Sequence, residues 1–179
     1  MKKIITSTIV ATILGTSAFA DQGSLTNMQV GYSSNASNTL SSSNHTGGGA
    51  YINYDIMGMV TSLPGFGAGV GLDINIWEGP GSTGVADDVN SIYTLGATAK
   101  VGYTFENNYN IPLKLKGGVG YGFMDVAAQT AWGLHYEASA EYRLFSSVGL
   151  GVKYKHAQAD ILGVTNEVDS TIGFVSFGR

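Results

Sequence analysis

Residues 93–105 read YTLGATAKVGYTF and alternate between apolar side chains and small or polar ones. Residues 132–144, WGLHYEASAEYRL, repeat the pattern with an apolar residue at every even position. A period of two is typical of a β-strand whose two faces meet different surroundings. Strands of soluble sheets average about 5–6 residues, so these two runs predict unusually long strands.

The same alternation recurs from residue 28 onward and predicts eight strands. Connections after odd strands are expected to be longer than those after even strands, as in outer-membrane barrels, whose long loops and short turns lie at opposite ends. Because tilted strands of about 9–11 residues cross a bilayer, we predict an all-β fold: an eight-stranded antiparallel up-and-down transmembrane β-barrel. The expected strands are 28–32, 50–56, 66–76, 93–105, 111–123, 132–144, 148–154 and 171–177, with long connections at 33–46, 78–90, 125–131 and 159–167 and shorter ones at 57–65, 106–110 and 146–147.

The composition excludes several other classes of protein. The chain has 179 residues, 12% of them charged, with a net charge of −4 and no cysteine. So few charges argue against a disordered chain or a coiled coil, and an acidic balance argues against a nucleic-acid partner. Beyond the N-terminal segment, no run of about 20 apolar residues predicts a membrane helix. Without cysteine, disulfides and thiolate metal sites are impossible.

The first twenty residues are typical of an export signal. Met1-Lys2-Lys3 is a basic start, an apolar stretch follows, and Ala18-Phe19-Ala20 matches a signal-peptidase site before Asp21. This three-part order is that of a secretory signal peptide. We therefore predict a cleaved signal over residues 1–20 and a single barrel domain over residues 21–179.

The charged residues of the strands share one face of the alternation. That face is otherwise rich in Gly, Thr, Ser and Asn, while the opposite face is apolar, and aromatic residues gather near strand ends. Such a distribution predicts a narrow polar interior with paired charges and an outer face in lipid between aromatic belts. We name the ten predicted interior charges the luminal network, and they are Asp55, Asp73, Lys100, Lys114, Lys116, Glu137, Glu141, Arg143, Lys153 and Lys155.

The signal, the eight alternating strands and a glycine-containing last strand resemble the small outer-membrane β-barrels of Gram-negative bacteria, the class of the OmpA membrane domain and OmpX. The resemblance covers residues 21–179 and is architectural. It implies a monomer in the cell outer membrane, with outer-membrane lipid and the barrel assembly machinery as partners. Such barrels usually end in an aromatic residue, whereas here Phe177 stands two residues before the end, which leaves the register of the last strand open.

His135, Ser139 and Glu141 invite comparison with a hydrolase site. Barrel lipases that deacylate lipid A use a Ser–His–Glu arrangement with the serine two positions after the histidine, but here Glu137 holds that position and Ser139 follows His135 by four. On alternation His135, Ser139 and Glu141 all face the interior, and two residues four apart on one strand do not make the contact that a nucleophile and its base need. A polar interior network is the favoured interpretation.

Other candidate sites are weaker still. His45, His135 and His156 show no metal-ligand spacing, and Asp87-Asp88 lacks the further oxygen ligands of a calcium loop. We predict no catalytic residue, metal or cofactor. The predicted function is a structural or surface-interaction role with an unidentified external ligand. A narrow porin-like channel and a barrel-embedded lipid hydrolase are the alternatives.

Overall fold

A computed structural model describes residues 24–38, 44–59, 62–63, 65–78, 92–105, 113–126, 129–161 and 163–178. The predicted signal peptide lies outside these residues, as do Asp87 and Asp88. Eight strands are present, and none is shorter than 13 residues. Their bounds are β1 Ser24–Asn38, β2 Asn44–Met59, β3 Phe66–Glu78, β4 Ile92–Phe105, β5 Leu113–Val126, β6 Gln129–Phe145, β7 Val148–Ile161 and β8 Val164–Gly178.

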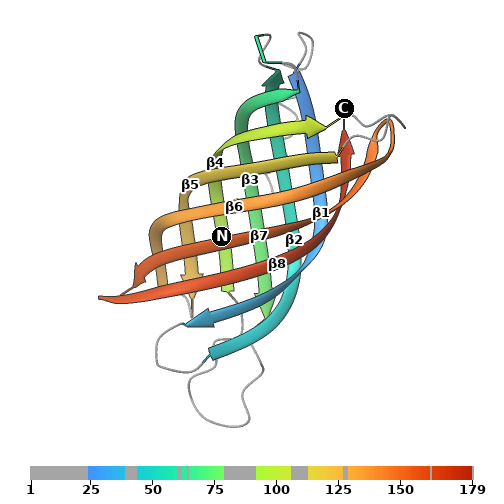
Figure 1. Cartoon of the computed structure of the whole chain (residues 1–179). Coiled ribbons are helices and arrows are strands. Elements are labelled where there is room, and N and C mark those ends of the chain that lie inside the picture. The colour runs from blue at the N-terminus through green and yellow to red at the C-terminus, as the bar shows by residue number, and fades with distance from the viewer. Residues whose placement is uncertain are drawn as a thin grey trace, which may run out of the picture.

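The strands form one closed antiparallel barrel in chain order, as Figure 1 shows. β8 closes the ring by pairing with β1, for example Val175 with Val30. The predicted fold class is confirmed. No helix of the described residues is long and apolar enough to cross a membrane. We call the end where β1 begins and β8 ends the terminal rim, and the opposite end the loop rim.

Most of three stretches that the sequence predicted as long loops, 33–46, 125–131 and 159–167, belongs to paired strands, so the prediction that connections after odd strands are the longer ones is wrong except at 79–91. β1 and β2 remain in register up to Asn38 opposite Asn44, and β7 and β8 up to Ile161 opposite Val164. Gly163, with a φ of 79°, supplies the left-handed turn geometry that glycine adopts without strain. At residues 33–38 the prediction was wrong because Ser and Asn in a strand were interpreted as loop composition.

The outer wall is apolar and carries aromatic residues near both rims. Near the loop rim, Tyr121 and Trp132 stack with ring centroids 6.0 Å apart. Near the terminal rim, Tyr103 and Phe105 pack edge to face at 4.6 Å. Two aromatic girdles around an apolar band are what a lipid-embedded barrel shows.

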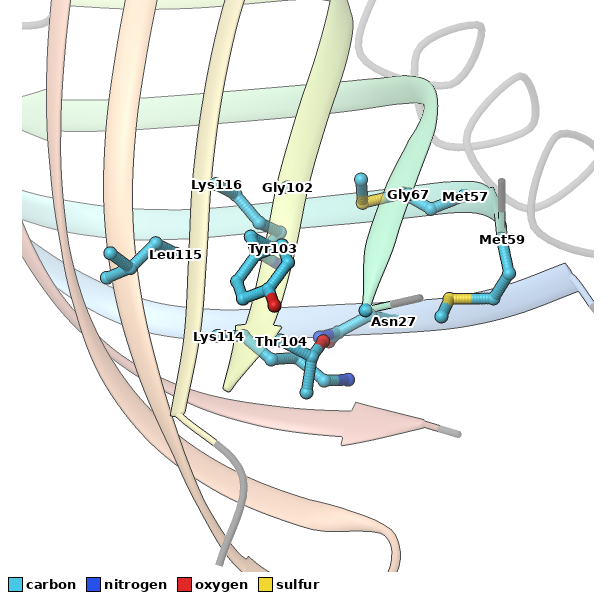
Figure 2. A pocket seen from close by; sticks show the side chains of 11 residues that line it. Asn27, Met57, Met59, Gly67, Gly102, Tyr103, Thr104, Lys114, Leu115 and Lys116 are labelled. Carbon is cyan, nitrogen blue, oxygen red and sulfur yellow. The ribbon is translucent and has the colours of Figure 1, made fainter. Parts of the chain in front are cut away.

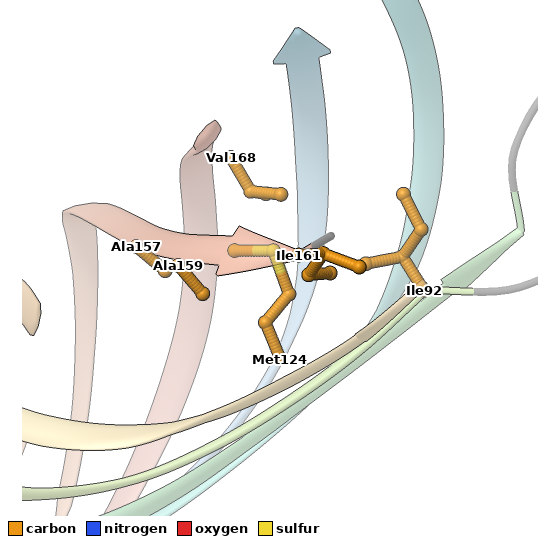
Figure 3. Close-up of a cluster of buried hydrophobic side chains, with 6 residues drawn as sticks. All are labelled: Ile92, Met124, Ala157, Ala159, Ile161 and Val168. Atoms are coloured by element: carbon orange, nitrogen blue, oxygen red, sulfur yellow. The ribbon is translucent and has the colours of Figure 1, made fainter. Parts of the chain in front are cut away.

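The interior is not polar throughout, which corrects the prediction of a wholly polar lumen. An apolar plug fills it at the loop rim and is shown in Figure 3. β4 and β5 contribute one residue each, and β7 contributes three because its strand continues past the predicted end at residue 154. The plug consists of Ile92, Met124, Ala157, Ala159, Ile161 and Val168.

Candidate functional site in the barrel lumen

The residues of the luminal network come from six strands, β2 to β7, and converge inside the barrel. Nine of the ten are buried, and Arg143 is half-buried. Four lysines, Lys100, Lys116, Lys153 and Lys155, form ion pairs with the four acids. Buried charges are tolerated where they are paired and hydrogen-bonded.

The larger group of ion pairs is centred on Asp55. Lys100 lies 2.5 Å from one Asp55 oxygen, and Lys116 lies 3.0 Å from the other. Lys100 also reaches Glu137 at 2.6 Å, and Lys153 reaches the same Glu137 oxygen at 3.2 Å. Because Asp55 is on β2 and Glu137 on β6, these pairs bridge opposite walls of the barrel.

A second group lies nearer the loop rim. Lys155 pairs with Asp73 and donates to the Thr94 hydroxyl at 3.3 Å. The His135 Nε2 lies 2.9 Å from Thr98 Oγ1 and 4.0 Å from Asp73. The second group therefore ties β3 and β4 to β6 and β7.

Glu141 lies in the part of the lumen nearest the terminal rim and joins several strands there. It accepts hydrogen bonds from Asn27 and Ser176, both at 2.9 Å, and pairs with Lys116 at 3.3 Å. A cavity of about 30 Å3 opens there between Asn27, Met57, Lys114 and their neighbours, as Figure 2 shows. A volume of this size holds about one or two waters.

Neighbours in register are not always partners in ion pairing. Glu137 lies opposite Lys155, yet Lys155 crosses the lumen to Asp73 on β3. Glu141 and Lys153 share the luminal face yet belong to different ion pairs. Lys114 lies opposite Glu141 without an ion pair to any described residue, and Arg143 donates to the Gly178 carbonyl at 3.4 Å.

Two of the three residues compared with a hydrolase site, His135 and Glu141, make separate contacts. His135 contacts Thr98, and Glu141 contacts Asn27, Ser176 and Lys116. Glu141 is therefore bound in a different layer of the lumen from the His135 imidazole.

Several interior residues were missed by the sequence analysis. Lys153 donates to the Tyr51 hydroxyl at 2.5 Å, and Asn53 donates to Asp55 at 2.8 Å. Nearer the loop rim, Asn75 binds Asn35 and Ser170, each at 3.0 Å. Tyr51 and Asn53 could have been found, since they precede Asp55 by four and two residues and therefore share its face.

Gly71 makes room for the Asp55–Lys100 pair and offers a direct test of this packing. A Cβ added at Gly71 would lie 2.5 Å from both the Asp55 Oδ1 and the Lys100 Nζ, whereas one at Gly173 would meet no atom within 4 Å. We expect Gly71→Ala to lower the free energy of unfolding by about 1–3 kcal/mol, the usual cost of overpacking. Urea unfolding in lipid vesicles measures this, and Gly173→Ala is the matched control. Equal stability of the two variants would contradict the packing described.

Solved structures with the same fold share little sequence with this chain. Neisserial surface protein A aligns with a TM-score of 0.61 at 14% identity, covering 87% of this chain and 99% of that one. The outer membrane enzyme PagL aligns with a TM-score of 0.58 at 14% identity, covering 83% and 98%. Ail, the attachment invasion locus protein of Yersinia pestis, aligns with a TM-score of 0.50 at 14% identity, covering 88% and 99%. At such identity these likenesses establish the fold alone.

No curated protein sequence matches the chain significantly. A family model does, and it spans nearly the whole sequence. It describes the outer membrane protein beta-barrel domain and matches residues 6–178. With the closed eight-stranded barrel, the apolar outer wall and this match together, the chain belongs to the outer membrane protein beta-barrel domain family.

Proposed function

We propose that this chain is a closed outer-membrane barrel with a structural and surface-contact role rather than a diffusion channel. Membership of its family implies the outer membrane, and we propose export through the signal at residues 1–20. The terminal rim then faces the periplasm, since the longest connection between strands, residues 79–91, leaves from the loop rim and long loops lie outside the cell in outer-membrane barrels. Outer-membrane lipid and the barrel assembly machinery are the proposed partners, and the proposed state is a monomer.

The observation that carries this proposal is the filled lumen. An eight-stranded barrel has an interior just wide enough for side chains. In the middle, ion pairs join β2 to β4, β4 to β6 and β6 to β7. At the loop rim, the apolar plug adds a second barrier, because ions do not cross a dry apolar constriction easily. The ion pairs and the apolar plug together support a closed lumen, in which the luminal network is the central structural element.

A non-catalytic role is part of the same proposal. Of the three residues compared with a hydrolase site, His135 contacts Thr98, while Glu141 is held by Lys116 and Ser176. A carboxylate held in this way does not orient the His135 imidazole as the base for a serine nucleophile. Neither alternative from the sequence analysis, channel or lipid hydrolase, has a described feature in the lumen that favours it.

Planar-bilayer recording of the refolded wild-type protein tests the closed lumen. We expect no sustained single-channel steps, since the ion pairs and the plug lie in series along the axis. The double variant Ile161→Ser/Met124→Ser removes apolar contacts of the plug and should produce brief openings while the heat-modifiable band of the folded barrel is retained. Sustained single-channel steps from the wild-type protein would contradict a closed lumen and favour the narrow channel instead.

A further inference from the structure

The outer wall carries one polar cluster that the closed-barrel role does not use. On β7 the outward residues change from apolar Leu150 and Val152 to Tyr154, His156 and Gln158 toward the loop rim. His156 lies opposite Asp169 of β8 in the register. Both face away from the lumen, because their chain neighbours Lys155, Ala157 and Ser170 are buried inside it.

Hydrogen bonds and ring stacking hold the side chains of the cluster in place. Asp169 Oδ1 lies 2.9 Å from His156 Nδ1 and also accepts a hydrogen bond from the Tyr154 hydroxyl. The Tyr136 ring stacks on the imidazole, with centroids 4.8 Å apart and planes 20° apart. The His156 side chain is only 13% exposed although it is on the outside of the barrel, while that of Asp169 is 48% exposed. Ionisable groups on a lipid-facing wall are rare and indicate function.

The position of the cluster matches the level of lipid headgroups. It begins where the apolar surface of β7 ends, and tyrosines prefer this interface. Within the described residues, the contacts of Asp169 all fall on Oδ1, and the contact of His156 with it uses Nδ1. Asp169 Oδ2 and His156 Nε2 are thus available to a molecule in the outer leaflet.

The chemistry of the cluster selects the ligand. A carboxylate oxygen and an imidazole nitrogen accept hydrogen bonds, and the residues Tyr136 and Tyr154 beside them are 45% and 43% exposed. All six described Lys and Arg side chains belong to the luminal network, so a phosphate would find no cation here. Hydroxyl groups can donate to the acceptors while a sugar ring packs on the tyrosines.

We propose that Tyr136, Tyr154, His156 and Asp169 form a binding site for the sugar hydroxyls of a glycolipid headgroup in the outer leaflet. The inference rests on the proposed outer-membrane placement, with the loop rim facing the cell exterior. It adds a specific lipid contact to the surface role and is independent of whether the lumen conducts.

Titration of the folded protein with a sugar detergent tests the site. The protein is held in dodecylphosphocholine micelles and titrated with dodecyl maltoside, whose headgroup supplies hydroxyls on the same length of alkyl chain. We expect saturable NMR shifts at the amides of residues 136, 154, 156 and 169. Asp169→Ala should weaken the apparent affinity at least about tenfold, the loss expected for a hydrogen bond to a charged group.

Asp160→Ala is the matched control, because Asp160 is an exposed acid of the same hairpin and contacts Thr165 at 2.8 Å. It should titrate like the wild type, and His156→Phe, which keeps a ring against Tyr136, should weaken affinity as Asp169→Ala does. Shifts that are non-saturable, or equal in Asp169→Ala and Asp160→Ala, would overturn the site. The bilayer recordings test the closed lumen independently of the sugar titration. If the sugar site fails its test, the proposal of a closed barrel is unaffected. If the wild type conducts, the proposal of a sugar site is unaffected.

Discussion

Asp55→Ala should be among the most destabilising single substitutions in this barrel, lowering the free energy of unfolding by about 3–5 kcal/mol. Asp55 is fully buried and faces two lysines, Lys100 at 2.5 Å and Lys116 at 3.0 Å. Without it, three buried lysines share Glu137 and Glu141, so that one positive charge has no counter-charge. Urea unfolding in lipid vesicles gives the difference in free energy directly.

A double-mutant cycle separates a coupled pair from two independent losses. We expect Asp55→Ala combined with Lys100→Met to cost less than the sum of the single changes, by about 0.5–3 kcal/mol, as contacting residues do. Asp160→Ala is the control for removing an acid from the surface and should stay within about 0.5 kcal/mol of the wild type. A cost below about 1 kcal/mol for Asp55→Ala would mean that water screens the charges, as it does for exposed pairs.

The eight strands could be predicted from the sequence because alternation is a local property of the chain. A residue two positions from a luminal one is luminal too, so Lys153 and Lys155 could be assigned to one face without knowing any partner. The prediction was wrong at residues 33–38, where the alternation continues and Ser33 and Asn35 belong to a strand and bind each other in the lumen at 2.9 Å. Their composition resembles a loop only when those interior partners are unknown.

The partners inside the lumen could not be predicted, because they depend on how the ring closes. Lys155 and Asp73 are 82 residues apart and on strands that are not neighbours in the sheet. A lysine side chain spans the narrow interior, so the choice between Glu137 beside it and Asp73 across from it is made by packing. The outward His156–Asp169 contact was missed for a different reason: Asp169 lay in the stretch between the predicted strand ends at 154 and 171.

The structure defines the register of the last strand, β8, against both of its neighbours, β1 and β7. Phe177 lies opposite Met28 of β1 and Val148 of β7, and it is 49% exposed on the outer wall. Gly178 continues the strand by one residue, and its amide donates to the Ser147 carbonyl at 3.0 Å. An aromatic side chain therefore occupies the lipid-facing position nearest the end of β8 among the described residues, although the sequence continues beyond it.

Leu72→Arg should cost about 2–4 kcal/mol of unfolding free energy in a lipid vesicle, the penalty for arginine near the middle of a bilayer on a barrel wall. Leu72 is in the middle of β3, 39% exposed, and lies between Tyr54 of β2 and Ala97 of β4 in the register. Its buried chain neighbours, Gly71 and Asp73, face the lumen. An arginine at position 72 must therefore point outward from the barrel wall.

Gln158→Arg is the matched control for Leu72→Arg, because Gln158 is also outward and exposed but is beyond the apolar part of β7. It should cost at most about 1 kcal/mol, as charged residues do near the membrane interface. The contrast should shrink when both variants are unfolded from detergent micelles, whose headgroups adapt to an added charge more easily than a bilayer does. If the two arginines cost the same in vesicles, the wall at Leu72 is not in the hydrocarbon region, and the membrane band must be sought elsewhere along the strands.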